Sequence, residues 1–192
     1  AKDGGLRKTS VGVLVLSGYL SGTFGRSRPL AFSASLTFEQ SYDEVEGDSA
    51  SSAELYAILC SLADVPMRQD IAVTGSVDQF GRIQAVGGVT EKVEGFFDLC
   101  RDRGLTGTQG VIIPAVNAVD LCVRPDVQEA IAAGQFHIWP VTRVEEGLAV
   151  LTGLPAGEPQ AFGTYPEGTL FRMVSDALDA MHQAISASPA TE

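Results

Sequence analysis

The stretch GDSASSAELYAILCSLADVP, residues 47–66, begins with small and polar residues and continues as an apolar run. Its large aliphatic residues recur three and four positions apart, which predicts a helix from about Ala50 to Ala63 with one apolar stripe. Pro66 follows at a place where helices often stop. The stripe consists of Leu55, Ile58, Leu59 and Leu62. The stretch therefore predicts an amphipathic helix that is entered through a serine-rich turn.

The serines at the start of this helix admit two interpretations. Ser51 and Glu54 fit a capping box, in which a serine and a glutamate satisfy each other's backbone donors. A nucleophilic serine also benefits from this place, because free N–H groups and the positive end of the helix dipole stabilise an alkoxide and a developing oxyanion. From the spacing alone, a helix cap and a catalytic serine both remain open.

Short apolar strands and helices surround this element. Strands are predicted over residues 11–20, 29–40, 110–117 and 135–141, and a hairpin over 71–88 turns at Asp78 to Gly81. Helices are predicted over residues 89–104, 118–123, 125–134 and 144–153. This alternation predicts an α/β fold of mixed (α+β) layers, in which mixed sheets are packed by helices.

Composition and charge narrow the classes of protein. A chain of 192 residues with 45% apolar residues can bury one good-sized core. The net charge of −11 repels a phosphate backbone, so we expect no nucleic-acid partner. Aliphatic runs are too short to cross a bilayer and no signal-peptide pattern is present, so we expect a cytoplasmic protein with no membrane partner.

The three cysteines, Cys60, Cys100 and Cys122, are odd in number, widely spaced and set among apolar residues. This pattern favours free buried thiols over a disulfide framework or a zinc site. We therefore expect no metal site in the chain.

A catalytic serine needs a base, and the sequence offers two kinds. His137 and His182 stand outside any recognisable triad motif, and GxSxG is absent, so a Ser-His-Asp hydrolase has weak support. Lys92 follows a Gly-Gly pair near the start of the helix predicted over 89–104. A lysine serves as a base only when it is neutral, which apolar burial and the positive end of a helix both favour. A solvated lysine beside Glu91 is the simpler interpretation of these residues alone.

The blocks EGDSASSAE (46–54) and PMRQDIAVTGSVDQFGRIQAVGGVTEKVEGF (66–96) resemble the peptidase domain of Lon proteases, and most closely the LonB type. The similarity continues through GVIIPAVNAVDL and FHIWPVTRVEEGLAVLTG, and it covers about Lys8 to Gly153. Two separated blocks at the family spacing are more specific than a lone short motif. The resemblance implies a Lon-type proteolytic fold and serine endopeptidase activity.

The resemblance also implies roles for particular residues. Ser49 aligns with the nucleophile and Lys92, 43 residues on, aligns with the general base of a Ser-Lys dyad. Thr74 aligns with the threonine whose hydroxyl holds the lysine amine, and backbone N–H groups around Ser49 are the expected oxyanion hole. Asp48 before the nucleophile is typical of the LonB type.

Two acidic residues near the site have less definite roles. Glu46 stands where the family often has Asp, and a carboxylate there can pair with Lys92 and favour its charged form, so Glu46 is a candidate modulator. Glu39, in a strand-end position of the LonB pattern, is either a surface carboxylate or a neighbour of the site.

The resemblance implies the following organisation. We expect a peptidase domain over residues 1–153 that lacks its first strands, a Pro/Gly-rich connector over 154–168, an amphipathic helix over 169–186 and a disordered tail over 187–192. No GxxxxGK[ST] occurs, so no cofactor is expected in this chain, whereas ATP and Mg are expected for the full-length enzyme. The expected partners are unfolded protein or peptide substrates and further copies of the chain in a hexameric ring.

Two alternatives stay open. A non-catalytic Lon-like domain that serves as an assembly or binding module has the same fold without the activity, although both dyad residues are present. The C-terminal helix either packs on its own core or against a neighbouring subunit.

Overall fold

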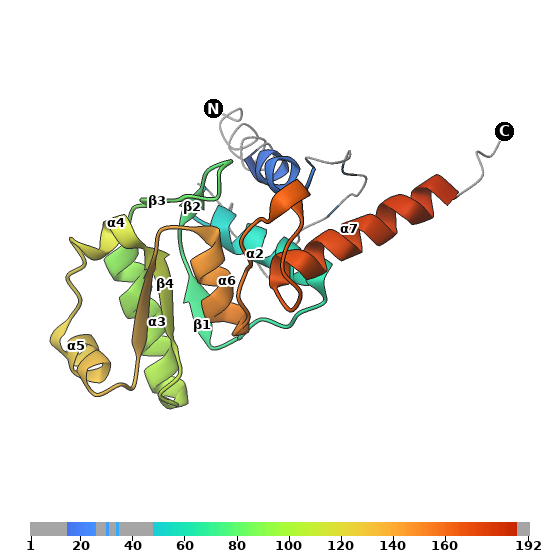
Figure 1. Cartoon of the computed structure of the whole chain (residues 1–192). Coiled ribbons are helices and arrows are strands. Elements are labelled where there is room, and N and C mark those ends of the chain that lie inside the picture. Colours follow the sequence, from blue (N-terminus) through green and yellow to red (C-terminus); the bar gives the residue numbers. More distant parts are fainter. Residues whose placement is uncertain (1–14, 26–29, 31–33, 35–47, 188–192) are drawn as a thin grey trace, which may run out of the picture.

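A computed structural model describes residues 15–25, 30, 34 and 48–187. Its centre is a three-stranded parallel sheet in the order β1-β4-β5 (Figure 1). These strands are β1 (Ile71–Val73), β4 (Gly110–Pro114) and β5 (His137–Val141). All five residues of β4 are buried, as expected for the middle strand of a sheet that is covered on both faces.

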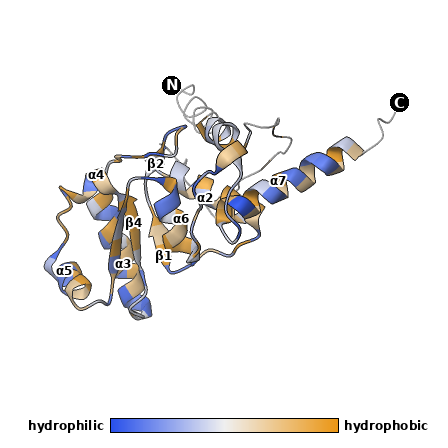
Figure 2. Ribbon diagram, viewed as in Figure 1, coloured by the Kyte–Doolittle hydropathy of each residue, from blue (hydrophilic) through white to orange (hydrophobic). Residues whose placement is uncertain are grey.

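Helices cover both faces of this sheet. Val111 and Ile113 pack into one apolar cluster with α3 (Val89–Arg103) and α5 (Pro125–Ala132). Ile112, which alternates with them along the strand, packs into the other cluster with α2 (Ser51–Ala63) and α6 (Val144–Thr152). The strands are mostly hydrophobic in Figure 2, whereas α3 also carries a hydrophilic face. The fold is thus the α/β, mixed-layer fold that the sequence predicts.

The hairpin predicted over residues 71–88 is shorter than expected. It consists of β2 (Ser76–Val77) and β3 (Ile83–Gln84), which pair antiparallel around the turn at Asp78 to Gly81. β1 does not belong to it and pairs in parallel with β4. The bond from the Thr74 N–H to the Ile112 carbonyl, 3.0 Å, continues the β1–β4 ladder up to the point where the chain turns into the hairpin.

The strand predicted over residues 11–20 is wrong where the structure describes it, because residues 15–24 are helical. Leu16, Tyr19, Leu20 and Phe24 are buried in the cluster that contains α2. These residues recur three and four positions apart, so the helical period prevails over the β-branched start of the segment. The strand predicted over 29–40 lies outside the described residues apart from positions 30 and 34.

The helices of the second half lie close to their predicted positions, with one shift. The helix predicted over 118–123 is instead α4 (Ala115–Ala118), which follows β4 directly. The segment between α6 and the last helix contains one short 3₁₀ helix, η1 (Ala161–Gly163). Across the part of the chain that the structure describes, no helix is both long enough and apolar enough to cross a membrane.

The last helix, α7 (Leu170–Ala187), packs its first half against α2 and projects its second half away from the body (Figure 1). Leu170, Phe171, Val174 and Leu178 are buried in the cluster around α2. Met181 and Ile185 continue the same stripe but are exposed. Packing on the chain's own core therefore accounts for the first half of α7 only.

The cysteines are free thiols, as predicted, but not all of them are buried. Cys60 and Cys100 are buried in the two apolar clusters, whereas Cys122 is exposed in the segment after α4. Burial raises the pKa of Cys60 to about 11, so this thiol stays protonated at neutral pH.

Candidate active site

Ser49 lies in the turn that leads into α2, one residue before the helix N-cap Ala50. The Ser51 N–H donates to the Asp48 carbonyl at 2.9 Å, which closes this turn around Ser49. The Ser49 side chain is half-buried. Among the bonds of the described residues, the N–H groups of Ser49 and Ala50 have no acceptor.

The backbone around Gly75 fastens this turn to the segment between β1 and β2. The Gly75 N–H donates to the Ser49 carbonyl at 2.8 Å. In return, the Gly75 carbonyl accepts from the Ser52 N–H at 3.2 Å and from the Ser52 hydroxyl at 2.8 Å. A Cβ on residue 75 would lie 3.1 Å from Ile83 and 3.3 Å from the Ser52 hydroxyl, so the close approach favours glycine here.

Two side-chain bonds extend this connection along β2. The Val77 N–H donates to the Ser51 hydroxyl at 3.1 Å, and the Ser76 hydroxyl donates to the Asp48 carboxylate at 2.8 Å. Ser51 therefore does not form the predicted capping box with Glu54, and the helix start has no side-chain cap. The box is replaced because Ser51 lies against a strand that offers an unpaired N–H. The pattern of residues 47–54 carries no signal for this long-range pairing.

Lys92 reaches Ser49 from the first turn of α3. Gly88 is the N-cap of this helix, and its φ of 66° lies in the left-handed region that glycine adopts without strain. The Lys92 N–H donates to the Gly88 carbonyl at 3.1 Å. The Lys92 Nζ donates to the Ser49 Oγ at 3.2 Å and to the Thr74 Oγ1 at 3.2 Å. The structure thus brings Ser49, Thr74 and Lys92 together although 43 residues separate the serine from the lysine.

Thr74, which contacts the Lys92 amine, is fixed to the sheet through its backbone. Its side chain is buried, and its N–H is bonded to the central strand β4. The Lys92 amine therefore contacts the hydroxyls of both Thr74 and Ser49. Lys92 itself is exposed in this single chain, which differs from the apolar burial that we expected for a lysine base. Val89 and Val93, on the same helix turn, are buried instead.

The other predicted residues lie elsewhere. Glu46 and Glu39 fall outside the described residues. His137 lies at the start of β5, where its Nε2 contacts the Gly107 carbonyl at 2.9 Å and its ring lies beside Trp139. Among the described contacts of His137 there is neither a serine nor a carboxylate, so a histidine-based triad gains no support. No group of three or more His, Cys, Asp or Glu side chains could hold a metal ion within the described ranges.

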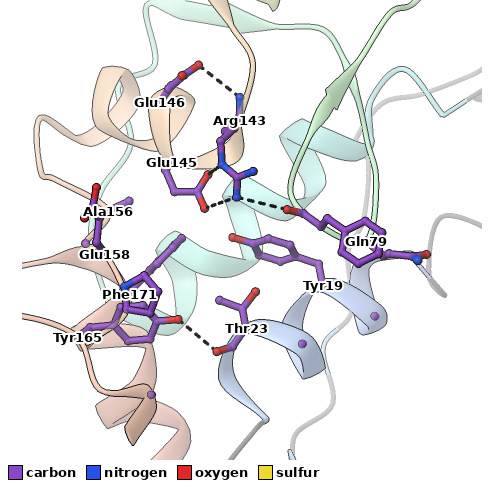
Figure 3. A pocket seen from close by; sticks show the side chains of 16 residues that line it. Tyr19, Thr23, Gln79, Arg143, Glu145, Glu146, Ala156, Glu158, Tyr165 and Phe171 are labelled. Atoms are coloured by element: carbon purple, nitrogen blue, oxygen red, sulfur yellow. Dashed lines mark hydrogen bonds and ion pairs between the residues drawn. The ribbon is translucent and has the colours of Figure 1, made fainter. Parts of the chain in front are cut away.

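A separate cavity of about 910 Å³ lies between the helix at 15–24, the hairpin tip and the start of α6 (Figure 3). Arg143 pairs with Glu145 beside Tyr19, and Tyr165 donates to the Thr23 carbonyl at 3.2 Å. Burial, together with the charge of Glu145, raises the pKa of Tyr19, so its hydroxyl stays protonated. The described lining of this cavity does not include Ser49, Thr74 or Lys92.

The fold and the site together define a class of protein. It is a mixed α/β domain that presents a serine hydroxyl beside a lysine amine at the start of a helix. Over residues 44–152 the chain matches the family model described as "Lon protease (S16) C-terminal proteolytic domain". The chain belongs to this family of Lon protease proteolytic domains.

Curated relatives agree with this assignment. The chain is 52% identical over 143 residues to a protein of Escherichia coli (strain K12) named "Putative Lon protease homolog", a match that covers 74% of this chain and 24% of that protein. A Haemophilus influenzae protein of the same name is 47% identical over 142 residues, again 74% and 24% of the two chains. The "Archaeal Lon protease" of Pyrococcus abyssi is 41% identical over 113 residues, or 59% and 10%. The chain therefore spans about a quarter of the length of the first two relatives.

Proposed function

We propose that the chain is a serine endopeptidase domain that uses Ser49 as nucleophile and Lys92 as general base. The observation that carries this proposal is the 3.2 Å contact between the Lys92 Nζ and the Ser49 Oγ at the start of α2. Nucleophile and base lie within proton-transfer distance, and Thr74 orients the base as a third member. Acyl transfer to water requires a nucleophile and a base in contact, and this arrangement contains both.

In the first half of the proposed reaction, the neutral Lys92 amine takes the hydroxyl proton of Ser49 while the Oγ attacks the carbonyl carbon of the scissile peptide. The carbonyl oxygen becomes an oxyanion, and the N–H groups of Ser49 and Ala50 are the donors proposed to stabilise it. The C–N bond then breaks as Lys92 returns the proton to the leaving amine. The products of this half are a free amine and an acyl ester on Ser49.

In the second half, Lys92 takes a proton from a water molecule whose oxygen attacks the ester carbon. The ester C–O bond breaks, the proton returns to the Ser49 Oγ, and a carboxylic acid leaves. Loss of water from around Lys92 in the enzyme–substrate complex favours its neutral form, since the amine is exposed in the single chain. Covering by substrate is therefore part of the proposed mechanism.

Glu46 is proposed as a modulator of this base. A carboxylate that pairs with the Lys92 amine favours its charged form and suppresses proton acceptance. Glu46→Gln is expected to change the pH profile of hydrolysis. An unchanged profile would remove Glu46 from the mechanism.

For the whole protein we propose ATP-dependent degradation of unfolded proteins in the cytoplasm by a homo-oligomeric, hexameric ring. The likeness to Lon proteases supports this. On the same likeness, ATP and Mg²⁺ are proposed as requirements of the whole protein. Residues 1–192 contain no GxxxxGK[ST] to hold a nucleotide. No step at Ser49 or Lys92 involves the nucleotide. Extended substrates offer main-chain groups to the site, which suits cleavage at many sequences.

The test is hydrolysis of unfolded casein and of a fluorogenic peptide by the chain and by Ser49→Ala, with the molecular mass measured by size-exclusion chromatography. Ser61→Ala, an exposed position of the same helix, is the matched control. We expect hydrolysis to be lost in Ser49→Ala and kept in Ser61→Ala. Equal hydrolysis by the wild type and Ser49→Ala would refute the proposal. A folded hexamer without hydrolysis would favour a non-catalytic assembly or binding module.

A further inference from the structure

The segment that leads into α3 has little regular structure of its own. Four residues, 85–88, separate the end of β3 from the start of the helix that carries Lys92. Two of them are glycines, and Gly88 has a left-handed backbone. Such a segment loses much conformational entropy when it is ordered, so it needs external contacts to fix the helix start.

Those contacts come from the side chain of Asn117 in α4. The Val86 N–H donates to the Asn117 Oδ1 at 3.0 Å, and the Asn117 Nδ2 donates to the Val86 carbonyl at 3.0 Å. The amide thus acts as a one-residue strand partner across 31 positions of the chain. Asn117 is also the sole asparagine of the sequence.

The same strand-helix unit also holds the threonine that contacts the lysine. Asn117 lies five residues after Ile112, whose carbonyl accepts from the Thr74 N–H at 3.0 Å. Val89 and Val93 pack against the cluster that contains Ile113, which presses α3 onto the sheet. Apolar packing of this kind permits small shifts along the helix axis, whereas two opposed hydrogen bonds fix one position. The β4–α4 unit therefore fixes both Thr74 and the start of α3.

We infer that Asn117 is a positioning residue for Lys92, which it serves by fixing Val86 and thus the start of α3. The inference rests on the proposed function of Lys92 as base. Asn117 lies on another element and contacts the backbone at Val86, six residues before the base. Without its amide, the 85–88 segment loosens and the Lys92 amine spends less time at the 3.2 Å contact with Ser49. When the nucleophile and the base are less often in contact, the rate of the chemical step falls far more than the affinity for substrate does.

The chain offers a matched control at the opposite end of α3. Gln109 also holds a loop through its side-chain amide: it accepts from the Thr106 N–H at 2.8 Å and donates to the Gly104 carbonyl at 3.5 Å. Gln109→Ala therefore removes an amide of the same chemistry, from the loop between α3 and β4, without contact to the Lys92 turn. The experiment compares Asn117→Ala, Asn117→Asp and Gln109→Ala with the wild type. Asn117→Asp keeps the acceptor for Val86 and removes the donor.

Three readouts are needed: kcat and KM for the fluorogenic peptide, the rate at which a fluorophosphonate labels Ser49, and amide exchange over residues 86–92. We expect both Asn117 variants to lose about ten- to a hundredfold in kcat and in labelling rate, with KM within about twofold and faster exchange at Val86. Gln109→Ala should match the wild type in all three. The unfolding midpoint, followed by the fluorescence of Trp139, tests that the variants are folded.

The outcomes separate the two proposals. Wild-type rates in Asn117→Ala and Asn117→Asp, with Ser49→Ala inactive, would overturn the positioning role and leave the dyad intact. The positioning role would also be overturned if all variants lost stability alike and Gln109→Ala lost as much activity as Asn117→Ala. A wild-type chain that neither cleaves peptide nor labels at Ser49 would instead refute the proposed function, and with it the role of Asn117.

Discussion

The hydroxyl of Ser52 donates to the carbonyl of Gly75 at 2.8 Å, and both groups lie in the interior of the domain. This bond joins the first turn of α2 to the segment that carries Thr74. Together with the bond from the Gly75 N–H to the Ser49 carbonyl, it keeps Ser49 and Thr74 at a fixed separation. The serine-rich turn is therefore held by the sheet and not by a cap within its own helix.

Removal of the Ser52 hydroxyl should destabilise the domain. Ser52→Ala leaves the buried Gly75 carbonyl with one bond fewer and should lower the free energy of unfolding by about 1–2 kcal/mol. Ser61→Ala gains the same helix propensity at an exposed position, so the difference between the two variants isolates the bond. Chemical denaturation followed by Trp139 fluorescence measures both. Equal stability of the two variants would contradict the role of this bond.

Lys92 should not be replaceable by arginine. Arginine keeps a positive charge but does not release its proton in proteins, so it cannot act as a base. Lys92→Arg and Lys92→Met are both expected to lower kcat for peptide hydrolysis by at least about 10³-fold. Circular dichroism serves as the control for folding. Substantial activity in Lys92→Arg would mean that the lysine contributes charge only.

Thr74 should be needed for its hydroxyl and not for its shape. Thr74→Val keeps the volume and removes the acceptor of the Lys92 amine, and we expect kcat to fall by about ten- to a hundredfold. Thr74→Ser keeps the hydroxyl and should stay within a few fold of the wild type. The comparison of kcat in these two variants is the measurement. If the valine variant is as active as the serine variant, the hydroxyl does not orient the base.

Stability should depend on pH through Asp70. Hydrogen bonds from Arg68 and Thr108 lower the pKa of Asp70 to about 2 in the folded chain, against an ordinary value of 3.8. A carboxyl whose folded pKa is depressed stabilises the fold above its ordinary pKa and loses this contribution as the pH falls toward the folded value. Because the pair is partly exposed, the effect should be about 0.5–1 kcal/mol.

Asp70→Asn should accordingly be less stable than the wild type at pH 7 and nearly equal to it near pH 2. Urea unfolding at the two pH values tests this sign. Asp102→Asn, which removes a carboxylate at an exposed position of α3, is the matched control for the loss of one acidic side chain. A larger deficit of Asp70→Asn in acid than at pH 7 would contradict the assignment.

Much of the fold after Ser51 could be predicted because periodicity and stop signals agree there. The helix predicted over 89–104 occurs as α3 and ends at Gly104, and the short apolar runs before and after α5 occur as β4 and β5. The segment at 15–24 could not be assigned correctly, since its apolar residues fit both periods. A short strand such as β1 also has no local feature that distinguishes a parallel partner from a hairpin partner.

The candidate site was likewise predicted in part and missed in part. The pairing of Ser49 with Lys92 was predicted through the resemblance, because a separation of 43 residues alone says nothing about contact. The buried serines beside Ser49 and the amide of Asn117 were missed, since their partners lie 23 to 31 positions away. Hydrogen bonds of that span arise from tertiary packing, and a local sequence window carries no signal for them.

The order of synthesis gives the bond between Thr74 and β4 a further consequence. A nascent chain contains Ser49 and Lys92 before it contains Ile112, whose carbonyl fixes Thr74. Until β4 has been translated and has paired with β1, the serine and the lysine are therefore present but not aligned. The proposed dyad would thus be aligned only after residues well beyond Lys92 have been translated and have folded.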